Sequence, residues 1–259
     1  MASASPSPPI FRIRDLTKSY GPKRVLDAVS FDVFAGESLI ILGRSGSGKS
    51  VLLRQLNGLE KPDAGTVEFD GMEISSLDER QLAPVRRRVA MLFQGGALFD
   101  SLTIGENVAF PLAEHTDLSA DEIRELAARK LQLVGLDGVG DKMPSALSGG
   151  MRKRAALARS LALDPEVVLF DEPTTGLDPV TSASIAHLIR TTQKRMSTTS
   201  VVVTHDLPMA RAVGDRVAFL AAGRFRFLGT WDEAERTRDD TFRHFLEGRF
   251  EEGEESAVA

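Results

Sequence analysis

One eight-residue segment constrains the fold of this chain more than any other. Residues 43–50 read Gly-Arg-Ser-Gly-Ser-Gly-Lys-Ser and match the pattern Gly-x-x-x-x-Gly-Lys-[Ser/Thr] in full. An apolar run over 38–42 precedes the segment, and a helical pattern over 51–56 follows it. In that context successive backbone N–H groups surround phosphate oxygens at the positive end of a helix. The segment therefore predicts a phosphate-binding loop, against the alternative of a Gly/Ser-rich turn without a ligand.

The side chains of this loop suit a nucleoside triphosphate bound with magnesium. Lys49 is placed to reach the β- and γ-phosphates, and the hydroxyl of Ser50 is placed to bind Mg²⁺. The residues that we expect to contact the nucleotide here are Gly43, Arg44, Ser45, Gly46, Ser47, Gly48, Lys49, Ser50 and Val51.

Strand and helix patterns alternate along the chain, which predicts an α/β fold around a parallel sheet. We expect strands at 11–16, 29–33, 38–42, 66–69, 89–93, 167–170, 200–203 and 217–220. Residues 95–163 differ in character and are predicted to be helical. Within them Ser119 and Glu122 have capping-box spacing, and Ser148 is a candidate cap for a helix that runs through Arg159. A further helix is expected over 182–195.

A second motif complements the phosphate loop. Four apolar residues, 167–170, lead directly into Asp171 and Glu172. A buried strand would deliver both acids to the edge of the sheet where ligands bind in such folds. Asp171 is then a candidate Mg²⁺ ligand, and Glu172 is placed to polarise an attacking water. Alone this motif is weak, because apolar strands often end in Asp, but its pairing with the phosphate loop is specific.

Three further features each allow a plain structural interpretation. Gln94 follows one predicted strand and His205 follows another, so they could be a surface amide and a helix cap. The sequence Leu-Ser-Gly-Gly at 147–150 opens a helix, and Ser148 alone could be an ordinary cap. In this order, with the two motifs above, they form a recognisable set.

The complete set resembles an ATP-binding-cassette (ABC) ATPase, over roughly residues 10–231. The Leu-Ser-Gly-Gly signature between the two phosphate-site motifs is highly specific to that family. The resemblance implies a P-loop NTPase with a RecA-like parallel-sheet core, an antiparallel β subdomain and an α-helical signature subdomain at about 95–163. The expected division is a disordered lead-in at 1–9, an ATPase domain at 10–235 and an acidic tail with an amphipathic helix at 236–259.

The resemblance also implies roles for individual side chains. Tyr20 matches the aromatic residue that stacks on adenine, with packing at a sheet edge as the alternative. Gln94 matches the glutamine that senses Mg²⁺ and the attacking water, and it faces the groove where a membrane partner docks. His205 matches the histidine that contacts the γ-phosphate and holds the geometry of Glu172.

The signature residues are expected to act across a dimer. By resemblance Ser148 and Gly150 contact the γ-phosphate of the nucleotide on a second copy, so two ATP molecules are held between head-to-tail subunits. Gly149 of the same signature and Asp178, which matches the D-loop of the family, are also expected to contact nucleotide. ATP binding closes this dimer and hydrolysis reopens it. The chain has no apolar stretch near the roughly 20 residues of a spanning helix, so a separate transmembrane permease is implied. The expected location is the cytoplasmic face of the inner (cell) membrane, through that permease.

Local sequence narrows the type of transporter. The run at 93–103, Phe-Gln-Gly-Gly-Ala-Leu-Phe-Asp-Ser-Leu-Thr, and the signature continuation Met-Arg-Lys-Arg at 151–154 closely resemble ATPases of MCE-type (Mla-like) lipid transporters. Such a system would include an MCE-domain protein, with a small regulatory subunit also possible. The segment at 174–178, Thr-Thr-Gly-Leu-Asp, departs from the Ser-Ala-Leu-Asp form that is common in the family. The alternatives are an importer of amino acids or another small solute, and a soluble nucleotide switch.

Charge argues against nucleic acid as a partner. The net charge is −5, and the clusters at 86–88 and 152–154 are interpreted as solvated helix and strand ends, the second with a possible phosphate or dimer contact. Residues 232–259 hold ten acidic residues and four arginines, so the acidity belongs to the tail. There Phe242, Phe245, Leu246 and Phe250 share one helical face. That face either packs on its own domain or docks on the partner ATPase. The absence of cysteine excludes disulfides and thiol chemistry.

Overall fold

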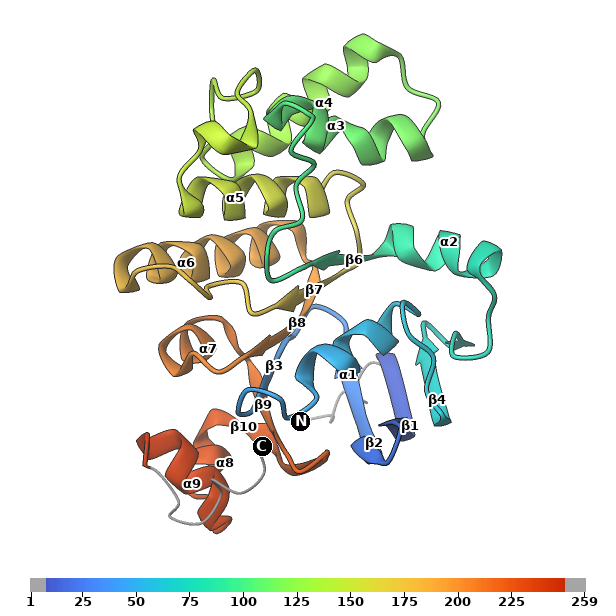
Figure 1. Cartoon of the computed structure of the whole chain (residues 1–259), viewed down its shortest axis with the longest axis vertical. Coiled ribbons are helices and arrows are strands. Elements are labelled where there is room, and N and C mark those ends of the chain that lie inside the picture. Colours follow the sequence, from blue (N-terminus) through green and yellow to red (C-terminus); the bar gives the residue numbers. More distant parts are fainter. Residues whose placement is uncertain (1–7, 250–259) are drawn as a thin grey trace, which may run out of the picture.

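The computed structural model describes residues 8–249 and contains two sheets joined by helices (Figure 1). The larger sheet has the order β10-β9-β3-β8-β7-β6, and its central strands are parallel. Its strands are β3 (Ser38–Leu42), β6 (Val89–Leu92), β7 (Val167–Asp171), β8 (Thr199–Thr204), β9 (Arg216–Ala221) and β10 (Arg224–Thr230), the last antiparallel to β9.

The smaller sheet is antiparallel, with the order β2-β1-β4-β5. Its strands are β1 (Pro9–Tyr20), β2 (Lys23–Phe34), β4 (Ala64–Phe69) and β5 (Met72–Glu73). β1 and β2 are longer than the sequence predicts, because irregular pairing lets them continue past Asp15 and Ala28, both at positive φ. β4 and β5 form a hairpin that turns at Asp70 and Gly71, both at positive φ.

The central strands are buried on both faces, as parallel strands usually are. Every residue of β3, β7 and β8 is buried. Because successive side chains point to opposite faces, Leu39 and Ile41 join one core with α1 (Lys49–Leu56), α2 (Glu79–Arg88) and the antiparallel sheet. Ile40 and Leu42 join the other core, with α5 (Gly149–Ser160), α6 (Pro179–Met196) and α7 (Leu207–Val213). The predicted fold class is confirmed.

Helices occupy most of residues 104–160, at the end of the molecule farthest from the C-terminal helices (Figure 1). α3 (Ile104–His115) and α4 (Ala120–Leu133) pack together and against α5, with a short 3₁₀ turn at Pro144–Ala146. The predicted capping box of α4 is present, with Ser119 and Glu122 as its two partners.

Two helices differ from the sequence prediction. The sequence does not predict α2, because only Leu82 and Val85 are buried, so the apolar pattern is weak, and because Pro84 lies inside the helix. The helix nevertheless begins with a capping box formed by Asp78 and Gln81. α6 begins at Pro179 rather than at residue 182, because Asp178 caps it and proline is well suited to the first helical turn.

The C-terminal helices pack on the larger sheet. In α9 (Asp240–Glu247), which follows α8 (Trp231–Glu235), the ring of Phe242 is fully buried and stacks on Phe219 of β9, with the centroids 4.7 Å apart. Phe245 also contacts Phe219, with centroids 5.0 Å apart. Within the described chain the apolar stripe therefore packs on its own domain, while Phe250 of that stripe lies outside the described residues. Across residues 8–249, no helix combines the length and hydrophobicity needed to span a bilayer.

Candidate functional site

The loop between β3 and α1 has the close backbone approaches that its glycines permit. A Cβ at Gly43 would lie 2.5 Å from the carbonyl oxygen of Leu220. Gly48, the N-cap of α1, has φ +101°, and a Cβ there would lie 2.9 Å from the carbonyl oxygen of Val25. Side chains at these two positions would displace the loop, so glycine is required for this conformation.

Lys49 is held beneath this loop. Its Nζ donates to the carbonyl oxygens of Gly43 and Arg44, at 2.8 and 3.1 Å, and lies 3.2 Å from Oε1 of Glu172. The residue is only 6% exposed. A buried cation at the N-terminus of a helix makes the loop a site for an anion such as phosphate.

Ser50 and Asp171 lie together, as the sequence predicts. Ser50 Oγ donates to Asp171 Oδ1 at 2.7 Å, which joins the start of α1 to the end of β7. Hydroxyl and carboxylate oxygens are the donors that Mg²⁺ prefers, so this pair fits the ion. Among residues 8–249 no group of three or more His, Asp or Glu side chains could hold a metal. The remaining ligands would therefore be oxygens of the nucleotide, of water or of an amide such as Gln94.

Glu172 connects two parts of the site. Its Oε1 faces Lys49, and its Oε2 lies 2.9 Å from Nδ1 of His205. The hydroxyls of Thr204 and Thr175 donate to the same Oε2 at 3.3 and 3.4 Å. Glu172 has φ +48°, an uncommon conformation for a residue with a side chain, of the kind that clusters at functional sites.

The pKa values of the two neighbouring acids, Asp171 and Glu172, shift in opposite directions. Burial raises the pKa of Asp171 above its ordinary value, against the opposing hydrogen bond from Ser50. Burial would also raise the pKa of Glu172, but His205 and Lys49 together lower it below its ordinary value. The lowered pKa keeps Glu172 ionised, as a carboxylate that accepts hydrogen bonds from its neighbours.

These groups open onto a cavity of about 960 Å³. Loop residues 44–46 and 48–51 line it, together with Gln94, Glu172 and His205. Gly43, Ser47 and Asp171 are not in the lining, and Asp171 is joined to the lining residue Ser50 by a hydrogen bond. Tyr20 lies at the rim, 46% exposed, with its hydroxyl bonded to Glu60.

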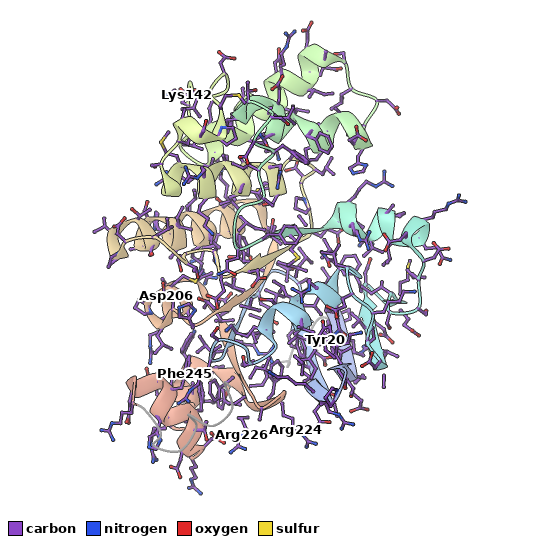
Figure 2. The ribbon with its side chains drawn as sticks, in the orientation of Figure 1. Tyr20, Lys142, Asp206, Arg224, Arg226 and Phe245 are labelled. Carbon is purple, nitrogen blue, oxygen red and sulfur yellow. The ribbon has the colours of Figure 1, made fainter. Side chains whose placement is uncertain are left out.

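Three cavity-lining residues come from the end of the described chain, where no motif indicated a site. They are Phe245, Gly248 and Arg249 of the C-terminal segment. Tyr20 on β1 and Phe245 on α9, both labelled in Figure 2, come from opposite ends of the sequence. Both line this one cavity. Lys23, Val25 and Leu207 also line it without a sequence signal.

The signature residues form a separate surface. Ser148 caps α5, its hydroxyl accepting from Met151 N at 3.3 Å, and Asp178 caps α6. A Cβ at Gly150 would lie 2.7 Å from Thr181 Cγ2, and one at Gly149 would lie 3.5 Å from Leu177. The two helix starts therefore touch. Ser148, Gly149, Gly150 and Asp178 do not line the cavity of their own chain.

Of the basic clusters predicted to be solvated helix and strand ends, Arg86–Arg88 do form the last turn of α2, and Arg87 and Arg152 are exposed. The other four basic side chains are half-buried and bonded. Arg86 donates to the carbonyl oxygens of Asn57 and Gly58, and Arg88 bonds Asp70 and Glu166. On α5 the side chains of residues 152, 153 and 154 each donate to a backbone carbonyl, of Leu147, Gln94 and Val134 respectively. For Lys153 and Arg154 tertiary packing supplies the acceptor, which the local sequence does not indicate.

Comparison with known proteins identifies relatives of this chain. Residues 26–175 match the model of the ABC transporter family. The probable ribonucleotide transport ATP-binding protein mkl of Mycobacterium leprae is 42% identical over 254 residues, covering 95% of this chain and 73% of that protein. The intermembrane phospholipid transport system ATP-binding protein MlaF of Escherichia coli K12 is 40% identical over 236 residues, covering 91% of this chain and 88% of that protein.

Solved structures of ATP-binding cassettes are also similar to this chain. The dimeric ATP-binding cassette MJ0796, in a post-hydrolysis state bound to ADP and Pi, superposes with a TM-score of 0.79 and is 34% identical, covering 85% of this chain and 98% of that one. The cassette cbiO1 of Clostridium perfringens, part of the complex cbiONQ, superposes with a TM-score of 0.81 and is 30% identical, covering 92% of this chain and 95% of that one.

Proposed function

The chain belongs to the ABC transporter family as an ATP-hydrolysing, ATP-binding subunit, and on that premise we propose that it powers phospholipid or related lipid transport between envelope membranes with an MCE-type system. The observation that carries the catalytic part of the proposal is the carboxylate of Glu172, which spans Lys49 and His205 beside the Ser50–Asp171 pair.

The proposed roles follow from this geometry. Lys49 binds the β- and γ-phosphates, while Ser50, Asp171 and Gln94 hold Mg²⁺, which would neutralise charge on the phosphates. Glu172 accepts a proton from the attacking water, and His205 orients Glu172 and reaches the γ-phosphate. Tyr20, at the rim of the cavity, supports the adenine base.

A second copy is proposed to complete each site. The surface of Ser148, Gly149, Gly150 and Asp178 lies outside its own cavity, and Ser148 opens a helix whose N-terminus favours an anion. We therefore place this surface on the γ-phosphate of the partner's nucleotide in a head-to-tail dimer. The dimeric form of MJ0796 supports the dimer.

We propose that the dimer drives a membrane permease. Phe99 and Phe110, 43% and 41% exposed, form an aromatic pair with centroids 5.0 Å apart in the segment that follows Gln94. We propose that the permease docks on this pair and holds the chain at the cytoplasmic face of the inner membrane. The lipid assignment is supported by the MlaF relatives and by the sequence run at 93–103.

One alternative substrate has a specific observation in its favour. The relatives that are 42% identical are named for probable ribonucleotide transport. A nucleotide-type solute importer is therefore the second candidate. The small-solute importer expected as the alternative from sequence belongs to the same class.

Two experiments test the proposal. Glu172→Gln should bind ATP and trap the closed dimer, seen as a doubling of mass, while hydrolysis falls about 10²- to 10⁴-fold. Near-normal turnover would refute Glu172 as the base. Purification of the tagged chain from its native membrane then separates the systems. An MCE-domain protein together with a permease supports lipid transport, a permease with a solute-binding protein supports the importer, and no permease at all would indicate a soluble switch.

A further inference from the structure

Helix α5 holds the loop that carries Gln94 by three contacts along one side. Lys153 Nζ donates to the carbonyl oxygen of Gln94, and Arg159 Nη2 donates to that of Gly96 at 3.2 Å. Between them Ala156 lies under Gly96, where a Cβ on the glycine would be 3.2 Å from the Ala156 Cβ. The three α5 residues are spaced three apart, so they lie along one side of the helix.

Lys153 and Arg159 are bonded to carbonyl oxygens of the loop. Among the described residues neither Lys153 nor Arg159 forms an ion pair with a carboxylate, although both are partly buried. Arg159 also lies over the ring of Phe99, at 5.4 Å from its centroid. A cation withdrawn from water is costly unless it is bonded. Here the bonding partners are carbonyl oxygens of a loop that has little regular structure of its own, so these side chains define where that loop lies.

The bond between Lys153 and Gln94 joins the signature helix to a residue of the nucleotide cavity. α5 begins at Ser148, which we place on the partner's nucleotide, whereas Gln94 lines the cavity of its own chain. A displacement of α5 is transmitted to Gln94 through Lys153, because the bond joins the helix to the backbone of that residue.

We propose that Lys153 and Arg159 are positioning residues, which clamp the Gln94–Gly96 loop onto the signature helix so that the two nucleotide sites of a dimer act together. This inference rests on the proposed function, because it takes the proposed roles of Gln94 and Ser148 as given. Neither side chain lines the nucleotide cavity, although the charge of Lys153 also interacts with Asp171 and Glu172. The route that we propose from both residues to the site is the loop, through the bonds to Gln94 and Gly96.

The test uses the full-length chain and compares turnover with nucleotide binding. Lys153→Met keeps the aliphatic stem and removes the donor. We expect kcat to fall about 10- to 100-fold, the size of effect that misplacement of a catalytic group causes, and the Kd of the monomer for ATP to stay within about twofold. Lys153→Arg, which retains a donor, should recover much of the loss. Arg124→Met, on the exposed surface of α4, is the control and should behave as wild type.

A double-mutant cycle separates a positioning role from a merely structural one. If Lys153 acts through the Gln94 amide, Lys153→Met should have little further effect in a Gln94→Ala background. A full loss from Lys153→Met in that background, or wild-type kcat in the single variant, would overturn the inference while leaving the proposed function intact. Wild-type turnover in Gln94→Ala would instead refute the proposed role of Gln94, and this inference with it. Thermal unfolding of each variant confirms that it is folded.

Discussion

Glu172 Oε2 and His205 Nδ1 lie 2.9 Å apart, although the two residues follow different strands of the sheet. β7 and β8 are parallel neighbours, with Asp171 paired to Val203, and the backbone N–H of Glu172 donates to the carbonyl oxygen of Val203 at 3.0 Å. The register of two strands therefore fixes the pair. Since Lys49 faces the other carboxylate oxygen, Glu172 is oriented from both sides.

The first prediction concerns this orientation. His205→Ala should lower kcat for ATP hydrolysis about 10²-fold, because misplacement of a catalytic group such as Glu172 has an effect of that size. The Kd for ATP should change much less, because Lys49 and the loop are untouched. Steady-state hydrolysis and nucleotide titration check both values. His187→Ala, in an exposed histidine of α6, is the matched control. Turnover near the wild-type rate would contradict a role for the pair.

The second prediction concerns magnesium. Chelation with EDTA should abolish hydrolysis and added Mg²⁺ should restore it, because the proposed ligands are hard oxygen donors. Ser50→Ala removes one donor and should raise the Mg²⁺ concentration for half-maximal activity about tenfold. Ser160→Ala, which removes a hydroxyl that donates to the carbonyl of Leu157, should leave the Mg²⁺ titration unchanged. An unaltered Mg²⁺ requirement in Ser50→Ala would exclude its hydroxyl as a ligand.

The third prediction concerns the C-terminal stripe. Phe242→Ala should lower the free energy of unfolding of the nucleotide-free monomer by about 3–5 kcal/mol, because it opens a cavity against Phe219 and Phe227. Urea unfolding measures the loss, and Arg243→Ala, on the exposed side of α9, should stay within about 0.5 kcal/mol of wild type. Normal monomer stability with weakened dimer formation would show instead that the stripe serves the partner subunit.

The fourth prediction concerns acid stability. Asp215 is partly buried, which would raise its pKa, but Arg190 and the backbone N–H of Ser38 bind its carboxylate and hold the pKa below the ordinary 3.8. A lowered carboxyl pKa stabilises the fold above the unfolded-state pKa, and that stabilisation is lost as pH falls through the folded-state value. Asp215→Asn should therefore be less stable than wild type from pH 7 to pH 5.

The same reasoning sets the control and the contrary outcome for Asp215. The difference in free energy of unfolding should shrink as pH falls below about 3.8. Asp117→Asn, at an exposed position, should show no comparable difference at any pH. A stability difference that grew on acidification would contradict a lowered pKa for Asp215 in the folded state.

Sequence reasoning succeeded where a short stretch carries its own chemistry. Residues 43–50 and the run that ends at Glu172 each specify a backbone shape and a set of side chains locally, and both lie where predicted. It failed at α2, where polar residues and Pro84 hide a capped helix. It also could not find the partners of Lys153 and Arg154, because the carbonyl oxygens of Gln94 and Val134 come from distant backbone and have no sequence signature.

The sequence by itself determined the family, the order of the motifs and most candidate site residues, because phosphate binding and strand burial impose local patterns. Only the tertiary structure decided that Phe245 and Arg249 line the same cavity as Tyr20. It likewise decided that Lys153 donates to the carbonyl oxygen of Gln94. It also decided that the C-terminal stripe packs on Phe219 within its own chain. Each of these contacts joins residues far apart along the chain. They depend on the stacking of helices on the sheet, which no local pattern of residues records.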